Sequence, residues 1–416
     1  MTAHAHPHFS AWRVLLPIGL GTALSLMGDT AMYAVLPTHT AVAGVSLASV
    51  GILLSANRWI RLLLNGPAGL AYDRWPRRRL FVAAMFVGAI STALYAFTQG
   101  FWPLLVGRLL WGLAWSGIWV GGNTIILDVT TESDRGHWTG LYQLSFYLGS
   151  AVGFATSGLL TDRLGYHGAL SVATGVTFLG ALIAFFFLPE TRGVKKDEGR
   201  RMKDDTAFVP TPSGFGGGGA ARRDSRNSAT LLYSVNRFVG AGVISATLGL
   251  LIQQRWGEVR LGGGSPIGVA TLSGVMLGSS TLISMIAAPV AGHWSDRAGR
   301  WRVAAGGLAL GILGLGLLAL GNPAVILLGV PLTAIAGGSN QSLATASLGD
   351  HSMEEQRGLS LGWMHTFGDL TSAIAPPLVY GVLPLIGLPG IYLATAGLTA
   401  AMLLWAVRLA QVPGQS

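Results

Sequence analysis

A charged segment occurs twice in this sequence, each time between two long apolar runs. Residues 69–79 read GLAYDRWPRRR and residues 292–302 read GHWSDRAGRWR, so a Gly, an Asp and two Arg recur 223 positions later. Arg135-Gly136 recurs 222 positions later as Arg357-Gly358. One register therefore holds over much of each half. The pattern predicts that the chain is a duplication.

The chain is also too apolar for a soluble enzyme. Of its 416 residues, 51% are hydrophobic and 11% are charged, which is typical of a chain surrounded mostly by lipid. Internal repeats in such a chain are typical of secondary transporters. The net charge of +9 does not indicate a nucleic-acid partner, because the basic residues collect in loops on one side. The absence of cysteine excludes disulfides and thiolate metal sites.

Apolar runs of about 20 residues are long enough to cross a bilayer as helices. Six such runs precede a polar segment in the middle of the chain, and six follow it. We therefore expect an all-α polytopic membrane protein with about twelve transmembrane helices in two six-helix pseudo-symmetric halves. The expected spans are 12–36, 46–71, 79–99, 102–127, 138–161, 167–188, 229–253, 266–291, 302–321, 324–348, 358–383 and 388–409.

The basic loops predict the orientation of the chain. Because Lys and Arg are retained on the cytoplasmic side, we expect both termini in the cytoplasm and the protein in the plasma membrane, the inner membrane if it is bacterial. His4, His6 and His8 are able to bind a metal, but a disordered tail is the simpler interpretation. The expected parts are an N-terminal tail (1–11), a six-helix bundle (12–190), a flexible linker (191–228), a second six-helix bundle (229–409) and a C-terminal tail (410–416).

The pattern G-x-x-x-D-R-x-x-R-R-R in residues 69–79 resembles the best-known signature of the major facilitator superfamily, in the loop between helices 2 and 3. The segment PETRG at 189–193 resembles the end of helix 6 in many members. The resemblance implies the MFS fold and rocking of two halves about a midplane site, driven by an ion gradient. It also implies a cytoplasmic gate formed by Gly69, Asp73, Arg74, Arg77, Gly292, Asp296, Arg297 and Arg300.

Ionisable residues at membrane depth are costly, so they are functional candidates, with a structural ion pair as the competing explanation. The helical rise places Arg58 within about 3 Å of the depth of Asp29, and Asn57 and Arg61 share a helix face with Arg58. We expect Asp29 to pair with Arg58 or Arg61. The other arginine would then attract an anionic group of a substrate. The alternative is a closed structural network of these three charges.

Arg108-x-x-x-Gly112 resembles the helix-4 signature of the superfamily, whose arginine is associated with proton coupling in many exporters. Arg108 is expected close to the outer boundary, where extension of its side chain to the interface is as plausible as a buried role. Trp111, Trp115 and Trp119 follow on the same helical face. They are candidates for stacking against a substrate, with simple packing as the alternative.

Helix 11 carries the candidates for proton binding, His365 and Asp369, which lie four residues apart on one face. Imidazole titrates near neutral pH, and together with Asp29 these residues form the predicted proton-coupling set. A structural hydrogen-bonded pair is the alternative. Their first-half counterparts, Gln143 and Tyr147, are polar and are further candidates for substrate binding. Arg237 is expected near the inner interface, because it aligns with the region of residues 13–14.

The preferred function is proton-coupled export of an amphipathic or anionic organic compound. Residues 149–158 resemble a helix-5 pattern of drug antiporters but lack its proline, which weakens that assignment. The alternatives are proton-coupled uptake of an organic anion and a non-transporting scaffold or receptor. No nucleophile–base pair, metal cluster or nucleotide loop indicates an enzyme or a cofactor. The expected partners are a small-molecule substrate, protons and the lipid bilayer, with the protein acting as a monomer.

Overall fold

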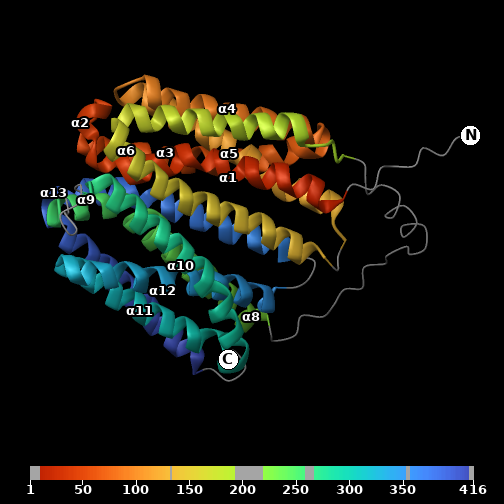
Figure 1. Cartoon of the computed structure of the whole chain (residues 1–416). Coiled ribbons are helices and arrows are strands. Elements are labelled where there is room, and N and C mark those ends of the chain that lie inside the picture. Colours follow the sequence, from red (N-terminus) through yellow and green to blue (C-terminus); the bar gives the residue numbers. More distant parts are fainter. Residues whose placement is uncertain (1–9, 132–133, 193–218, 258–266, 353–356, 412–416) are drawn as a thin grey trace, which may run out of the picture.

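The computed structural model describes residues 10–131, 134–192, 219–257, 267–352 and 357–411, which are almost wholly helical (Figure 1). The first half contains short elements η1 (Leu36–Thr38) and α2 (Thr40–Ala43) among its long helices. These long helices are α1 (Ala11–Val35), α3 (Leu47–Arg74), α4 (Arg77–Phe97), α5 (Phe101–Val129) and α6 (Arg135–Phe187). The second half contains α8 (Gly219–Arg237), η2 (Phe238–Ile244), α9 (Ser245–Arg255), α10 (Val269–Ala298), α11 (Arg300–Leu320), α12 (Pro323–His351) and α13 (Arg357–Ala410).

Helices α6 and α13 each form two membrane spans. Their 53 and 54 residues would extend about 80 Å if straight, against a hydrocarbon layer of about 30 Å. The backbone leaves helical geometry at Gly165 (φ 74°) in α6 and at Gly387 (φ 64°) in α13, where glycine tolerates a positive φ. Ten helices of the described chain are long and apolar enough to cross a membrane. Because α6 and α13 each contain two spans, these ten helices provide twelve spans, as predicted.

The segment between the halves differs from the prediction at both of its ends. Helix α8 begins at Gly219, ten residues before the expected span, because a hydrophobic run marks only the lipid-facing part of a helix. Thr191 and Arg192, predicted to belong to a flexible linker, are bound to the first half through hydrogen bonds to Asp128 and to the end of α3. Residues 193–218 and the histidines of the N-terminal tail lie outside the described residues.

Each half has its own apolar core. In the first half α1 packs against α6 and α4 against α5, and in the second half α11 packs against α12 and α13. A third apolar cluster joins both halves at the end of the molecule that carries α2 and α9, which we call the closed end. There α6 packs against α10 and α3 against α13. Side chains at Gly51, Gly158 and Gly274 would collide with backbone of the opposite half, so glycine permits this close approach.

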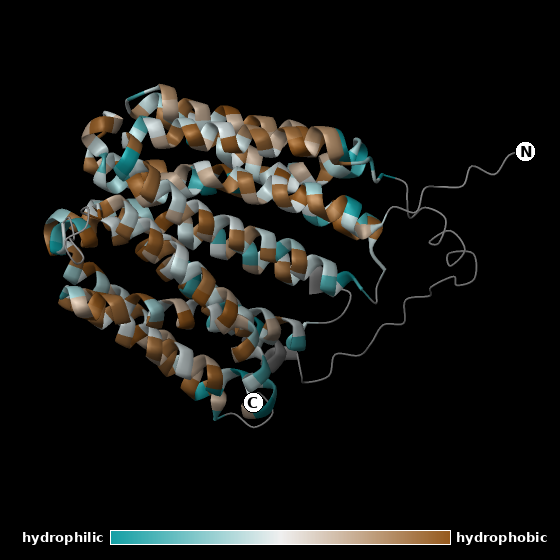
Figure 2. Cartoon of the chain, viewed as in Figure 1, coloured by the Kyte–Doolittle hydropathy of each residue, from teal (hydrophilic) through white to brown (hydrophobic). Residues whose placement is uncertain are grey.

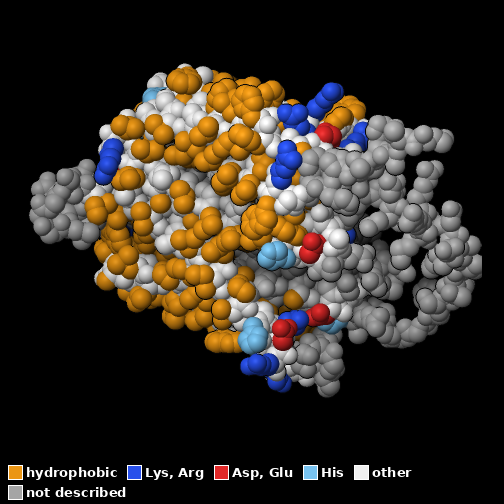
Figure 3. Space-filling view, turned by 45° about the vertical axis from the view of Figure 1, so that its right-hand side comes forward, with side chains coloured by type: hydrophobic (Ala, Val, Ile, Leu, Met, Phe, Trp, Pro, Cys, Tyr) orange, Lys and Arg blue, Asp and Glu red, His pale blue; other side chains and the backbone are white. Residues whose placement is uncertain are grey.

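The opposite end of the molecule, which we call the basic end, carries residues 10 and 411 and the loops that follow α3 and α10. Figure 1 shows the two halves meeting at the closed end and spreading apart toward the basic end. Hydrophobic residues predominate along the long helices, and hydrophilic residues are concentrated at the ends of these helices (Figure 2). Blue side chains gather at the basic end in Figure 3. The exposed arginines there are Arg13, Arg74, Arg79, Arg192, Arg297, Arg302 and Arg408 among the described residues.

Candidate functional site

A buried ion pair joins α1 and α5. Arg108 is fully buried, and its Nη1 donates to Oδ1 of Asp29 at 2.5 Å while its Nε donates to the carbonyl oxygen of Leu53 at 2.9 Å. Asn57 also approaches this carboxylate, with Nδ2 at 3.4 Å. The prediction that Asp29 pairs with Arg58 or Arg61 was therefore wrong. Both side chains lie beside the apolar cluster of the closed end, where Arg108 also donates to the hydroxyl of Tyr33, and the prediction had compared α1 with α3 alone.

Arg58 has main-chain partners in the opposite half. Its Nη1 donates to the carbonyl oxygen of Ser372 at 2.6 Å, and its Nη2 donates to that of Ala241 at 2.7 Å. The guanidinium carbons of Arg58 and Arg108 lie 5.2 and 5.3 Å from the centroid of the Tyr33 ring. Among the described residues, no carboxylate forms a salt bridge with Arg58. Its guanidinium is stabilised by carbonyl dipoles and a cation–π contact.

Two arginines from different halves converge on one carboxylate. Nη2 of Arg61 lies 2.6 Å from Oδ1 of Asp369, and Nη2 of Arg237 lies 3.7 Å from the same atom. The three side chains are 13%, 27% and 18% exposed for Arg61, Arg237 and Asp369. Neither Nε atom has a hydrogen-bond partner in the described structure. We call these three residues the Asp369 cluster. The expected position of Arg237 near the inner interface was wrong, because α8 begins at Gly219 and Arg237 is the last of its 19 residues, whereas residues 13–14 lie in the first turn of α1.

The charges of this interior do not balance. Arg108 is paired with Asp29, and Arg61 and Arg237 share Asp369. Arg58 contacts two carbonyl oxygens and the ring of Tyr33 and has no carboxylate partner among the described residues. This group of four arginines and two aspartates therefore carries two positive charges in excess. A cationic group that is partly buried without a matching anion favours binding of an anion from solution.

Further polar candidates line the same region. Nδ1 of His365 lies 2.9 Å from the hydroxyl of Tyr233, so His365 does not pair with Asp369. Tyr147 on α6 accepts a hydrogen bond from Nε2 of Gln341 on α12 at 3.2 Å. Gln143 is exposed and has no hydrogen bond among the described residues. Of these two first-half candidates, Tyr147 is the one with a hydrogen bond to the other half in the described structure.

The tryptophans of α5 pack against one another. The rings of Trp111 and Trp115 stack at 5.9 Å, and those of Trp115 and Trp119 stack at 5.8 Å. Trp111 and Trp115 are buried in the core of the first half, where Phe146 of α6 covers the stack. This arrangement favours the packing alternative for these two residues. Trp119 alone keeps partial exposure.

The predicted gate residues lie at the basic end, in two separate sets. Nε of Arg77 donates to Asp128 at 3.1 Å, and Nε of Arg300 donates to Asp350 at 3.1 Å. Arg300 also binds Asp296 at 2.5 Å. In the described structure no hydrogen bond or salt bridge joins one set to the other. The role as a gate stays a prediction, to which Gly69, Asp73, Arg74, Gly292 and Arg297 also belong.

The acidic partners of these arginines were not among the predicted site residues. Asp128 and Asp350 lie 222 positions apart, which is the register of the Arg-Gly repeat, so the same comparison of halves would have found them. Glu190 was noted only as part of a motif, yet its carboxylate accepts from the backbone N–H groups of Arg77 and Arg78 at 2.9 and 3.2 Å. It caps the N-terminus of α4, where the helix dipole favours a negative charge.

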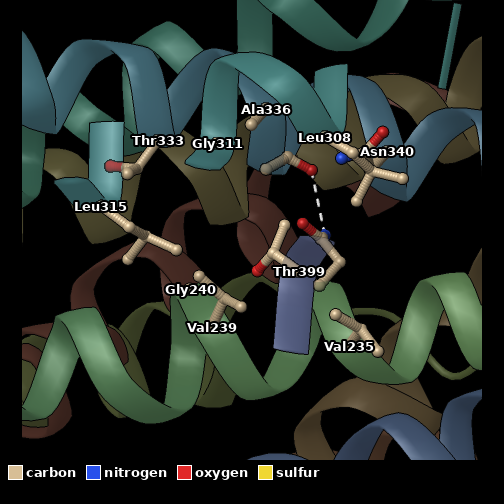
Figure 4. Close-up of a pocket in the computed structure, with 12 residues that line it drawn as sticks. Val235, Val239, Gly240, Leu308, Gly311, Leu315, Thr333, Ala336, Asn340 and Thr399 are labelled. Carbon is tan, nitrogen blue, oxygen red and sulfur yellow. Dashed lines mark hydrogen bonds between the residues drawn. The ribbon is translucent and has the colours of Figure 1, made fainter. Parts of the chain in front are cut away.

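A small cavity of about 30 Å³ lies inside the second half (Figure 4). Asn236, Thr333, Asn340 and Thr399 contribute its polar groups among mostly apolar neighbours. Nδ2 of Asn236 donates to the carbonyl oxygen of Gly337 at 3.0 Å, marked in Figure 4. The cavity has room for a water molecule but not for an organic substrate. The Asp369 cluster is therefore the better candidate site.

The fold and the buried charges define a polytopic membrane protein of two repeats with a charged site between its halves. The family model described as Major Facilitator Superfamily matches residues 18–279 and 239–415. The chain belongs to this superfamily of membrane transporters, as the signature at residues 69–79 indicated.

Curated relatives are similar over part of their length. The probable 4-methylmuconolactone transporter of Cupriavidus pinatubonensis is 31% identical over 173 residues, which are 42% of this chain and 38% of that protein. The class B tetracycline resistance protein of Escherichia coli is 27% identical over 42% of this chain and 44% of that protein. The 4-hydroxybenzoate transporter PcaK of Pseudomonas aeruginosa is 27% identical over 43% and 40%. The matched segments thus span about two fifths of these relatives.

Solved structures support the fold over nearly the whole chain. A bacterial homolog of the human lysosomal transporter Spinster, in an inward-facing and occupied conformation, has a TM-score of 0.74 at 15% identity, covering 95% of this chain and 96% of that one. The human organic anion transporter MFSD10 has a TM-score of 0.65 at 20% identity, covering 96% and 100%. These likenesses confirm the predicted all-α MFS fold.

Proposed function

We propose that this protein is a proton-coupled carrier of a small organic anion, which binds at the Asp369 cluster. The observation that carries the proposal is the convergence of Arg61 and Arg237 on one carboxylate oxygen of Asp369. Arg237 donates no hydrogen bond in the described structure, and its Nε and that of Arg61 are unpartnered. A carboxylate of the substrate would accept hydrogen bonds from these guanidinium groups.

The proton has a defined place in this scheme. When Asp369 is ionised, its carboxylate forms ion pairs with both arginines. When it is protonated, these ion pairs are lost and the cluster carries two positive charges. A proton on Asp369 therefore strengthens binding of an anion, and by linkage the anion strengthens binding of the proton. Two ligands that favour each other's binding move in the same direction through an alternating-access carrier. This argument favours symport.

The sequence-based preference was for export, and the buried tryptophans weaken it. Trp111 and Trp115 were candidates for stacking against an exported substrate, whereas both pack inside the first half. Uptake of an organic anion together with protons, initially the alternative, now agrees better with the excess positive charge. The 4-hydroxybenzoate relative adds support for an anionic substrate. The tetracycline resistance relative keeps export as the competing function.

Alternating access would use the two ends described above. The structure has its halves joined at the closed end and spread at the basic end (Figure 1). The gathering of arginines at the basic end (Figure 3) supports a cytoplasmic location for that end and for both termini, as the positive-inside rule predicts. The described state would then be inward-facing in the plasma membrane. The gate residues at the basic end would meet when the halves rock, and His365 would take part in proton exchange through Tyr233.

A binding experiment tests the proposal. Purified protein is titrated with benzoate between pH 5.5 and 8.5, as wild type, Arg237→Gln, Asp369→Asn and Arg163→Gln, the last being an exposed arginine at the closed end. We expect affinity to rise as pH falls in wild type and in Arg163→Gln. Asp369→Asn should bind with little dependence on pH, and Arg237→Gln should lose at least tenfold in affinity. Equal affinity in Arg237→Gln and wild type would contradict the proposal.

A further inference from the structure

The two repeats give the space between the halves two walls of different chemistry. In the repeat register, Asp369 on α13 corresponds to Tyr147 on α6, and Arg61 on α3 corresponds to Ser284 on α10. Helices α3 and α13 pack together on one side, and α6 and α10 pack together on the other. The first wall therefore carries an ion pair at the positions where the second wall carries two hydroxyl groups.

We call the second wall, with Tyr147 and Ser284, the neutral wall. Its side chains form hydrogen bonds but retain donor and acceptor atoms that are not used. Tyr147 accepts from Nε2 of Gln341 at 3.2 Å, and Ser284 donates to the carbonyl oxygen of Ala334 at 2.8 Å. The hydroxyl hydrogen of Tyr147 and Oε1 of Gln341 have no hydrogen-bond partner among the described residues. Both side chains are half-buried. This pair thus offers one donor and one acceptor to a neutral polar group.

The neutral wall and the Asp369 cluster face the same space. Tyr147 binds Gln341 on α12, and one turn earlier on α12 the carbonyl oxygen of Gly337 accepts from Asn236, the neighbour of Arg237 on α8, at 3.0 Å. Tyr233 of α8 contacts His365 at 2.9 Å. A molecule held by Arg237 therefore lies within reach of Tyr147.

We propose that the substrate carries a neutral hydroxyl or carbonyl group in addition to its carboxylate, and that Tyr147 and Gln341 determine specificity by binding that group. The inference rests on the proposed function, because it takes the anion site at the Asp369 cluster as given. A site that hydrogen-bonds a substrate hydroxyl discriminates strongly against an analogue that lacks it, since its own polar groups would stay unpaired. A substrate of this class contacts both halves at once. Its binding would therefore influence the movement of the halves relative to each other.

Matched pairs of probes test this specificity. Purified protein is titrated at pH 6 with benzoate and 4-hydroxybenzoate, and with hexanoate and 6-hydroxyhexanoate. We expect the hydroxylated member of at least one pair to bind tenfold or more tightly in wild type. Tyr147→Phe removes one oxygen and should bring that pair to near parity, because the hydroxylated member loses a hydrogen bond that the unsubstituted acid never makes. Tyr166→Phe is the control, because the buried hydroxyl of Tyr166 has no hydrogen-bond partner in the described structure.

The outcomes separate the two proposals. If carboxylates bind but no hydroxylated member is preferred, or if Tyr147→Phe keeps the preference, the specificity proposal is overturned and the anion site stands. If none of the four acids binds, the anion site is wrong and the specificity proposal falls with it. Loss of the preference in Tyr147→Phe, with both acids retained, supports the assignment.

Discussion

Arg58 in the first half donates a 2.7 Å hydrogen bond to the carbonyl oxygen of Ala241 in the second half. Ala241 lies within η2, a π-helical stretch whose wider turn changes the hydrogen-bonding pattern of the backbone. The same guanidinium binds Ser372 on α13, so one arginine holds two elements of the opposite half. Arg58 was predicted to bind substrate, but these contacts indicate a latch that stabilises the state with the closed end shut.

Removing this latch should shift the conformational equilibrium. Hydrogen bonds to a charged group contribute about 1.5–3 kcal/mol each, so losing two of them favours the alternative state at least tenfold. We expect Arg58→Gln to lengthen the distance between spin labels on cysteines introduced at Ala41 and Leu320, both exposed at the closed end. The chain has no native cysteine, so the labels are unambiguous. An unchanged distance distribution would show that Arg58 is not a latch.

A second contact at the closed end joins α6 to α10. Oδ2 of Asp162 accepts from the backbone N–H of Thr271 at 2.7 Å, in the first turn of α10, where a carboxylate is favoured. Loss of such a cap costs about 1 kcal/mol, which corresponds to a fivefold shift in population. With the same pair of labels, Asp162→Ala should increase the open fraction by about this factor. Asp162→Asn keeps a capping oxygen and should resemble wild type; equal opening in both variants would argue against a capping role.

The pair between Asp29 and Arg108 should contribute to stability. Removing one partner leaves a buried charge uncompensated, at a cost of about 3–5 kcal/mol. We expect Asp29→Asn and Arg108→Gln each to lower the melting temperature in detergent, and the double variant to be more stable than the worse single one. A double variant that is no better than the worse single one would show that the two residues do not interact.

Substitution of Trp111 distinguishes a packing role from a role in substrate contact. It is 1% exposed and stacks on Trp115, so Trp111→Leu should cost about 2–4 kcal/mol of stability through the cavity that it leaves. The affinity for benzoate should stay within twofold of wild type. Melting temperature and titration measured on one preparation check both statements. A large loss of affinity at unchanged stability would restore the predicted role in substrate binding.

Much of the fold could be predicted because apolar length and the repeat register are properties of sequence alone. The twelve spans appear as apolar runs, and the glycines at 165 and 387 fall between adjacent runs. The arginine that pairs with Asp29 could not be predicted, because Arg58, Arg61 and Arg108 all have long side chains that extend several Å from the helix. Which of them meets Asp29 depends on the tilt and rotation of three helices. Arg237 was misplaced because its alignment with residues 13–14 assumed that the helix starts at the same point in both repeats, whereas α8 begins 18 residues before Arg237.

The most direct test of the central claim is simultaneous measurement of proton and anion movement. Liposomes containing the protein and a pH-sensitive dye are exposed to radiolabelled 4-hydroxybenzoate, with Asp369→Asn and Arg163→Gln in parallel. The account predicts that wild type and Arg163→Gln move protons and anion in the same direction, and that Asp369→Asn moves no protons with the anion. Protons moving against the anion, or proton coupling retained in Asp369→Asn, would contradict it.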